Sequence, residues 1–143
     1  MGFPTITDVA LTLQIALAGV LAGVIGWQRH EVGRPAGPRT HALVAMAAAS
    51  FSLAGVAGFA PVGSRDVTRI AAQVVTGIGF LGAGTIFRAE DHVLGLTTAA
   101  SLWFAAALGV LIAGGLEWTA VFATILTYAV LTIVGRIENR GLR

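Results

Sequence analysis

The chain contains no cysteine and no lysine, and only 11% of its 143 residues are charged. Without cysteine, neither a disulfide framework nor a thiolate metal site can form. A soluble domain of this length carries about 25% charged residues, because surface that faces water needs charge. Such a deficit, together with 56% hydrophobic residues and a mean hydropathy of +0.84, indicates a chain embedded in lipid. The net charge of +2 is too small for a nucleic-acid-binding protein, so we expect no nucleic-acid partner.

Five apolar segments have close to the ~20 residues that cross the hydrocarbon core of a bilayer. They are predicted at about 9–27, 42–60, 70–87, 97–114 and 118–134. Between the first two, Pro35, Gly37 and Pro38 exclude a continuous helix. The sequence therefore predicts an all-α membrane protein, a compact bundle of five transmembrane helices that forms a single domain over residues 1–143.

The arginines predict the orientation of this bundle. With five spans and the amino terminus outside, the cytosolic side receives Arg29, Arg34, Arg39, Arg88, Arg136, Arg140 and Arg143. The outer side receives only Arg65 and Arg69, as the positive-inside bias requires. If the third segment did not span, the better orientation would place six arginines against three, so the preference for five spans is modest. We expect the amino terminus outside and the carboxyl terminus in the cytosol.

Residues 77–84 read G-x-G-x-x-G-x-G, a string usually quoted for nucleotide-binding loops. That fingerprint needs a strand before the glycines, a helix after them and an acid about 20 residues further on. Here residues 71–87 are one unbroken apolar run, and no acid lies between His92 and Leu116. The pattern therefore does not predict a nucleotide site.

In lipid, helices associate largely by close backbone approach, which small residues permit. We therefore predict helix packing through six glycines: Gly19, Gly23, Gly77, Gly79, Gly82 and Gly84. Similar small-residue stripes run through Ala72, Thr76, Gly79 and Ala83, and through Ser101, Ala105, Gly109 and Ala113. An alternative stays open, because each glycine weakens a helix by about 1 kcal/mol relative to alanine. The third helix could instead be broken at residues 77–84, as substrate-binding helices of transporters are.

Polar residues at two levels are candidate contact sites. Within the membrane, Gln73 and Thr76 are expected to form interhelical hydrogen bonds or to contact a ligand. At the cytosolic face the candidates are Glu31, Arg34, Arg39, His41, Thr97 and Thr98. One interpretation is that the arginines hold orientation, Glu31 pairs with Arg34 or Arg39, and Thr97 or Thr98 caps the fourth helix. The other is a site for a partner protein or a phosphate-bearing ligand. For His41 we expect a polar residue at the cytosolic interface, and a sensor of acid is the alternative.

The acids give no metal site. Every carboxylate lies in a connector or a tail or at the boundary of a span, namely Asp8, Glu31, Asp66, Glu90, Asp91, Glu117 and Glu138. Mg²⁺ prefers carboxylate oxygens, so an acidic ring inside the membrane is not visible in a single chain. We expect no cofactor, and the sequence leaves a magnesium site unassigned. No acid–base pair is placed for catalysis, so we do not expect an enzyme.

Three strings carry a resemblance to a known family: RIAAQVVTGIGFLGAGTIF at 69–87, GRPAGPRTHALV at 33–44 and GLTTAASLWFAAALG at 95–109. Together they resemble the MgtC/SapB family of bacterial inner-membrane proteins. The resemblance covers about 23–115 and implies a five-helix membrane domain in the bacterial inner membrane. Many members continue into a cytosolic ACT-like domain, and from the sequence as printed we expect the transmembrane domain alone.

The resemblance also implies magnesium homeostasis or adaptation to acid and low magnesium, and partners such as ATP synthase or a magnesium transporter. The first hypothesis is a non-enzymatic membrane protein that binds membrane partners helix to helix. The alternative is a transporter or channel for Mg²⁺ or another cation, with its pathway near the glycine-rich third helix. Under either hypothesis we expect self-association, and a homodimer first, because glycine-faced helices often pair with their own copies.

Overall fold

A computed structural model describes residues 5–58, 66, 68–89 and 92–141, and these residues are almost entirely helical. The first half comprises α1 (Ile6–Glu31), α2 (Pro38–Leu53), the π-helical turn η1 (Ala54–Gly58) and α3 (Thr68–Ala83). A hairpin of β1 (Phe87–Ala89) and β2 (His92–Leu94) follows. The second half comprises α4 (Leu96–Ala113), α5 (Glu117–Ala129), the π-helical turn η2 (Val130–Val134) and α6 (Gly135–Gly141).

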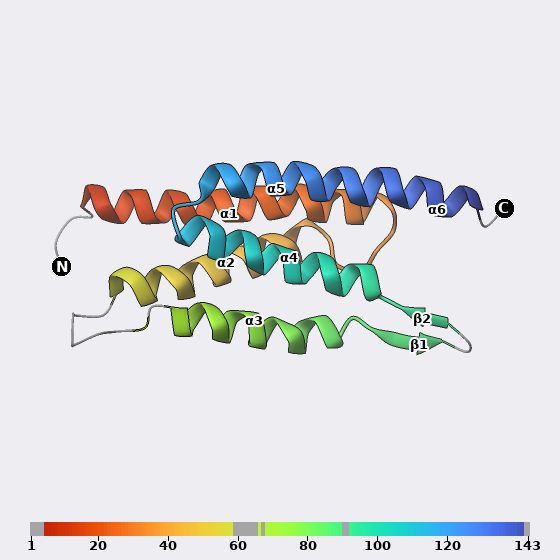
Figure 1. Cartoon of the computed structure of the whole chain (residues 1–143), viewed down its shortest axis with the longest axis horizontal. Helices are drawn as coiled ribbons and strands as arrows, with labels where there is room; N and C mark the ends of the chain where they lie inside the picture. The colour runs from red at the N-terminus through yellow and green to blue at the C-terminus, as the bar shows by residue number, and fades with distance from the viewer. Residues whose placement is uncertain (1–4, 59–65, 67, 90–91, 142–143) are drawn as a thin grey trace.

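The long helices lie side by side and alternate in direction along the bundle (Figure 1). Helices α1, α2 and α4 pack against one another, α5 packs against α1 and α4, and α3 packs on the flank against α4 and α2. The end of α1, the starts of α2 and α4, the hairpin and α6 all lie at the same end of the bundle (Figure 1). This is the end that the arginine count predicts to be cytosolic.

The core is built mostly from alanine. Its buried residues come from α1, α2, α4 and α5, and they are Ala18, Ala22, Ala45, Ala49, Ala105, Leu108, Ile112 and Ala120. At Gly109 the backbones of α2 and α4 approach so closely that a Cβ would lie 2.7 Å from the Ala49 nitrogen. Helices α2 and α4 therefore pack by the predicted mode, in which small residues permit close backbone contact.

Within the described residues, four helical stretches are long and apolar enough to cross a membrane: Thr7–Glu31, Pro38–Ala57, Leu96–Ala113 and Glu117–Glu138. Helix α3 has 16 residues and is not among them. At 1.5 Å per residue it is about 24 Å long, which is shorter than the ~30 Å of hydrocarbon. The chain is thus a mainly helical protein with four candidate spans, and the fifth span and the orientation remain predictions.

Helix α3 passes unbroken through Gly77, Gly79 and Gly82 and ends at Ala83, so the alternative of a helix broken at 77–84 is wrong over these residues. Its start is fixed by Asp66, whose carboxylate accepts hydrogen bonds from the hydroxyl and the N–H of Thr68. These two bonds hold the pKa of the exposed Asp66 carboxyl below its ordinary value.

The helix ends earlier than the predicted boundary at 87, because Gly84 and Thr85 form a turn that leads into the hairpin. In the hairpin, Phe87 pairs with Leu94 and Ala89 with His92. Gly95 then takes a φ of +90°, which an L-residue with a side chain adopts only at a cost. This glycine turns the chain from β2 directly into α4.

Candidate functional site

The outer face of α3 carries polar and small residues that no other described helix covers. Gln73, Thr76, Gly77 and Gly79 are all exposed. A Cβ added at Gly77 or Gly79 would meet nothing within 4 Å. The Thr76 hydroxyl donates to the carbonyl of Ala72 in its own helix at 3.0 Å. Packing through Gly77 and Gly79 therefore remains a prediction about another molecule.

The Gln73 amide makes no hydrogen bond to any residue that the structure describes. It lines a groove of about 560 Å³ between α2, α3 and α4, and it is the only polar residue in the lining. The interhelical hydrogen bond expected of Gln73 is thus not formed inside the described chain. An amide that faces hydrocarbon without partners is unfavourable, because lipid offers it no hydrogen bonds.

The other predicted packing glycines divide into two kinds. Gly82 faces α4, where a Cβ would lie 3.7 Å from that of Ala99, and Gly19 faces α2 across Met46. Gly23 has open space around it, and Gly84 lies in the turn after α3. Among the described residues, Gly19 and Gly82 are the two of the six at which an added Cβ would meet another helix.

Close approach also occurs at Gly26, which the six predicted glycines did not include. A Cβ on Gly26 would lie 2.6 Å from the Cα of Pro38, so this glycine lets the start of α2 lie against α1. The sequence carried a signal for it, because Gly26 continues the helical register of Gly19 and Gly23.

His41 is completely buried between α2 and α4. Its Nε2 lies 3.0 Å from the Ser101 hydroxyl, and its Nδ1 lies 3.0 Å from the Gly37 carbonyl. Ser101 is itself only 3% exposed and donates to the carbonyl of Thr98. This serine–histidine pair has a backbone carbonyl where a catalytic triad has a carboxylate, and neither residue lines the groove beside α3 or the cavity at the predicted cytosolic end. The pair therefore serves as a polar tie between two helices.

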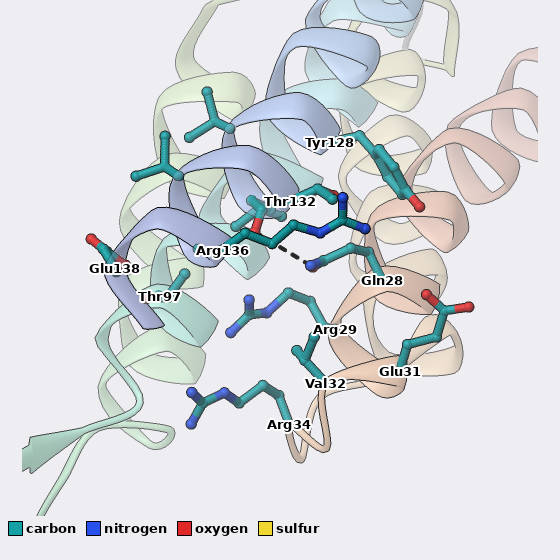
Figure 2. Close-up of a pocket in the computed structure, with 14 residues that line it drawn as sticks. Gln28, Arg29, Glu31, Val32, Arg34, Thr97, Tyr128, Thr132, Arg136 and Glu138 are labelled. Atoms are coloured by element: carbon teal, nitrogen blue, oxygen red, sulfur yellow. Dashed lines mark hydrogen bonds between the residues drawn. The ribbon is translucent and has the colours of Figure 1, made fainter. Parts of the chain in front are cut away.

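A cavity of about 370 Å³ opens at the predicted cytosolic end, between the end of α1, η2 and α6. We call it the arginine cavity, because Arg29, Arg34 and Arg136 line it (Figure 2). Gln28 lies beside Arg29, and its Nε2 donates across 3.4 Å to the carbonyl of Leu131 in η2. The sequence placed all three arginines on the same side of the membrane, but it did not indicate that Arg136 would join the other two.

The remaining cytosolic candidates fall at different places. Thr97 lies at the edge of the arginine cavity, Thr98 is buried, and Arg39 is exposed on α2 outside the cavity. The expected cap by Thr97 or Thr98 is wrong, because Gly95 occupies the N-cap and no side chain caps α4. Its left-handed backbone brings the chain straight from the hairpin into the helix.

Glu31 does not pair with an arginine in the described structure. Its carboxylate accepts a hydrogen bond of 2.9 Å from Trp27 Nε1, and it points away from Arg29 and Arg34 (Figure 2). Among the described residues, no group of three or more His, Cys, Asp or Glu side chains is arranged to hold a metal ion.

Comparison with known proteins gives a family and several relatives. The family model described as "MgtC family" matches residues 15–140. "Putative magnesium transporter YhiD" of Escherichia coli (strain K12) is 40% identical over 133 residues, which make up 90% of this chain and 62% of YhiD. "Protein MgtC" of Brucella abortus (strain 2308) is 48% identical over 116 residues, which make up 81% of this chain and 48% of that protein.

"Protein MgtC" of Salmonella typhimurium (strain 14028s / SGSC 2262) is 46% identical over 114 residues, which make up 80% of this chain and 48% of that protein. The chain thus spans between about half and about three fifths of the length of these curated relatives. None of these three names describes an enzyme. No solved structure matches the chain.

Proposed function

Because this chain belongs to the MgtC family, we propose that it serves magnesium-related homeostasis in a bacterial inner membrane by binding another membrane protein, without catalysis. The contact surface is the outer face of α3, formed by Gln73, Thr76 and Gly79, which follow one another at intervals of three residues. The observation that carries this proposal is the absence of any helix of the described chain over that face.

The chemistry of the face favours a transmembrane helix as the occupant. Gly79 lies on the same stripe as Thr76, and with nothing within 4 Å of an added Cβ it allows a second helix to approach the α3 backbone closely. Gln73 supplies an amide with up to four hydrogen bonds to make, and a polar group on the partner helix would satisfy it. Phe80, which is 83% exposed, adds a large apolar contact at the same level of the bundle. Small residues, one amide and one aromatic ring together suit helix-to-helix docking.

The partners to test first are ATP synthase and a magnesium transporter of the same membrane, which the family resemblance implies. Gly79→Leu places a bulky side chain on the face and should abolish co-purification with the partner, while membrane insertion persists. Ala16→Leu adds similar bulk to an exposed position on α1 and should leave the complex intact. Co-purification of the Gly79→Leu protein at the unsubstituted level would show that this face is not the contact.

A homodimer through the same face is a second outcome that can be measured directly. Because the chain has no cysteine, Gly79→Cys introduces a single thiol. Oxidation in membranes should then give a covalent dimer if two α3 helices meet. A covalent dimer and no heteromeric complex would identify a second copy of this chain as the occupant.

Cation transport is the alternative, and it is favoured by the word transporter in the name of YhiD. The groove beside α3 offers a cation only the Gln73 amide, however, and its other lining residues are apolar. Mg²⁺ prefers carboxylate oxygens and retains several waters, neither of which this groove accommodates well. Liposomes that contain the protein and an Mg²⁺-sensitive dye decide the matter, because influx above empty vesicles under a gradient and a potential would favour transport.

A further inference from the structure

Arg29 is a buried cation whose side chain has no hydrogen-bond or ion-pair partner among the described residues. It is only 5% exposed, and its Nε is enclosed with no hydrogen-bond acceptor. Among the residues that the structure describes, no carboxylate lies within ion-pair distance of it. Enclosing part of a guanidinium is costly unless an acceptor compensates it, so the Nε of Arg29 lacks the partner that its burial calls for.

The local fold adds a second cation beside the first. After α1 the chain reverses through Gly33, whose φ is +71°, and the Arg34 N–H donates to the carbonyl of Arg29 at 3.0 Å. The side chains of Arg29 and Arg34 then extend in the same direction into the arginine cavity (Figure 2). Arg136 of α6 lines the same cavity, so three cations from the two ends of the chain share one space. Such a lining favours an anion, because guanidinium groups form strong charge-assisted hydrogen bonds with phosphate and carboxylate oxygens.

Two enclosed oxygen atoms in or beside the cavity also lack partners. They are Oε1 of Gln28, which is 5% exposed, and the hydroxyl oxygen of Thr132. The Nε2 of Gln28 is already committed to Leu131, so its oxygen remains as an acceptor without a donor. Guanidinium groups bind an anion, whereas an amide oxygen accepts a hydrogen bond, which a hydroxyl on the same ligand would donate.

We propose that the arginine cavity binds the phosphate group of a phosphate ester that also carries hydroxyl groups. The phosphate lies among Arg29, Arg34 and Arg136, and a ligand hydroxyl donates to Oε1 of Gln28. The shared chemistry is that of a phosphoglycerol, supplied either by the headgroup of an anionic phospholipid or by a soluble phosphate ester.

The acids in the lining do not change this assignment. Glu31 is held by Trp27 and turned away from the arginines, and Glu138 is exposed on α6 (Figure 2). Three arginines against two carboxylates leave the lining positive. The N-terminus of α4, where Thr97 borders the cavity, adds further positive potential because its first N–H groups have no side-chain cap. A metal cation is therefore disfavoured here.

The test measures binding of two probes to purified full-length chain in lipid-free detergent. Phosphatidylglycerol is added in mixed micelles, with phosphatidylcholine as the reference lipid, and retained lipid is measured by native mass spectrometry. Glycerol 3-phosphate is titrated by calorimetry, and inorganic phosphate serves as the probe without a hydroxyl-bearing arm. Retention of phosphatidylglycerol alone identifies a lipid headgroup, and saturable binding of glycerol 3-phosphate identifies a soluble ester.

Arg29→Gln should weaken binding of the active probe about tenfold or more, because a charge-assisted contact in an enclosed site is lost. Arg39→Gln removes the same charge from an exposed position at the same end of the bundle and should leave binding unchanged. Equal weakening in the two variants would mean diffuse attraction to a basic surface and would overturn the proposal. So would the absence of binding of either probe to the unsubstituted chain.

Arg136→Gln is a second test of the site that can be used if the Arg29→Gln protein does not fold. Arg136 is exposed, so its replacement should preserve the helical circular dichroism spectrum and still weaken binding several-fold. If Arg29→Gln does not fold, the Arg136 variant decides, and unchanged binding in it contradicts the proposed site. The outcome is independent of the α3 face, since neither residue contributes to that surface.

Discussion

The ring of His41 on α2 lies 3.0 Å from the hydroxyl oxygen of Ser101 on α4, and both side chains are buried. The Nδ1 of His41 contacts the Gly37 carbonyl, and the Ser101 hydroxyl reaches the Thr98 carbonyl at 2.8 Å. If the neutral His41 ring donates through Nδ1, its Nε2 can only accept a hydrogen bond. The Ser101 hydroxyl has one proton, so it can donate either to His41 Nε2 or to the Thr98 carbonyl. The pair ties two central helices together through a short polar chain.

Ser101→Ala should lower the free energy of unfolding by about 1–3 kcal/mol, because it leaves a buried ring nitrogen of His41 without a partner. Ser50→Ala is the matched control, since the Ser50 hydroxyl bonds only to the Met46 carbonyl of its own helix. Denaturant unfolding in detergent measures both variants. Equal midpoints for the two would show that the His41–Ser101 tie does not stabilise the bundle.

Gly109→Ala should destabilise the contact between α2 and α4 by about 1–3 kcal/mol, because overpacking forces the backbones apart. The added Cβ would lie 2.7 Å from the Ala49 nitrogen and 2.8 Å from the Ala48 Cβ. Gly23→Ala meets nothing within 4 Å and should instead be neutral or stabilising by up to about 1 kcal/mol, through better helix propensity. Thermal unfolding that moves in the same direction for both variants would contradict this packing.

Gly95→Ala should prevent the hairpin from leading into α4. The new Cβ would overlap the carbonyl of Thr85, in addition to the cost of a φ of +90°. Gly115→Ala faces only the conformational cost, about 1–2 kcal/mol, because its φ is +75° but its surroundings are open. We expect far less folded protein in the membrane fraction for Gly95→Ala than for Gly115→Ala. Comparable yields would refute the close contact at Thr85.

Gln73→Leu should leave stability within about 0.5 kcal/mol, since the amide makes no hydrogen bond in the described chain. The same change should weaken association with the partner membrane protein, because the docked helix loses its polar contact. Unfolding midpoints and co-purification separate the two effects. A large loss of stability would place Gln73 inside the fold and remove it from the proposed docking face.

Much of the helical architecture can be predicted from the sequence, because the length and hydropathy of each apolar segment locate the helices along the chain. The predicted segments 97–114 and 118–134 match the starts of α4 and α5 to within one residue. The hairpin was not predicted, since the pairing of Phe87 with Leu94 lies between helices and its turn lacks glycine. The π-helical turns were not predicted either, because residues such as Val130 and Leu131 suit an ordinary helix equally well.

The candidate sites were less predictable, for a geometric reason. Helical spacing shows which residues share a face, but it does not show what covers that face. Gly79 and Gly82 are three residues apart in one helix, yet Gly82 meets α4 and Gly79 meets nothing. Similarly, Arg29 and Arg136 were expected on one side of the membrane, but their shared cavity depends on how α6 lies beside the end of α1.

The short α3 has a consequence for the bilayer itself. If this helix crosses the membrane, its ~24 Å falls about 6 Å short of an average hydrocarbon thickness, so the lipids along that flank must thin. Deforming lipid on one side costs energy, and two molecules that place their thinned flanks together deform less lipid than two apart. Association along α3 would then strengthen as the acyl chains of the host vesicle lengthen, which makes the membrane's own thickness a regulator of assembly.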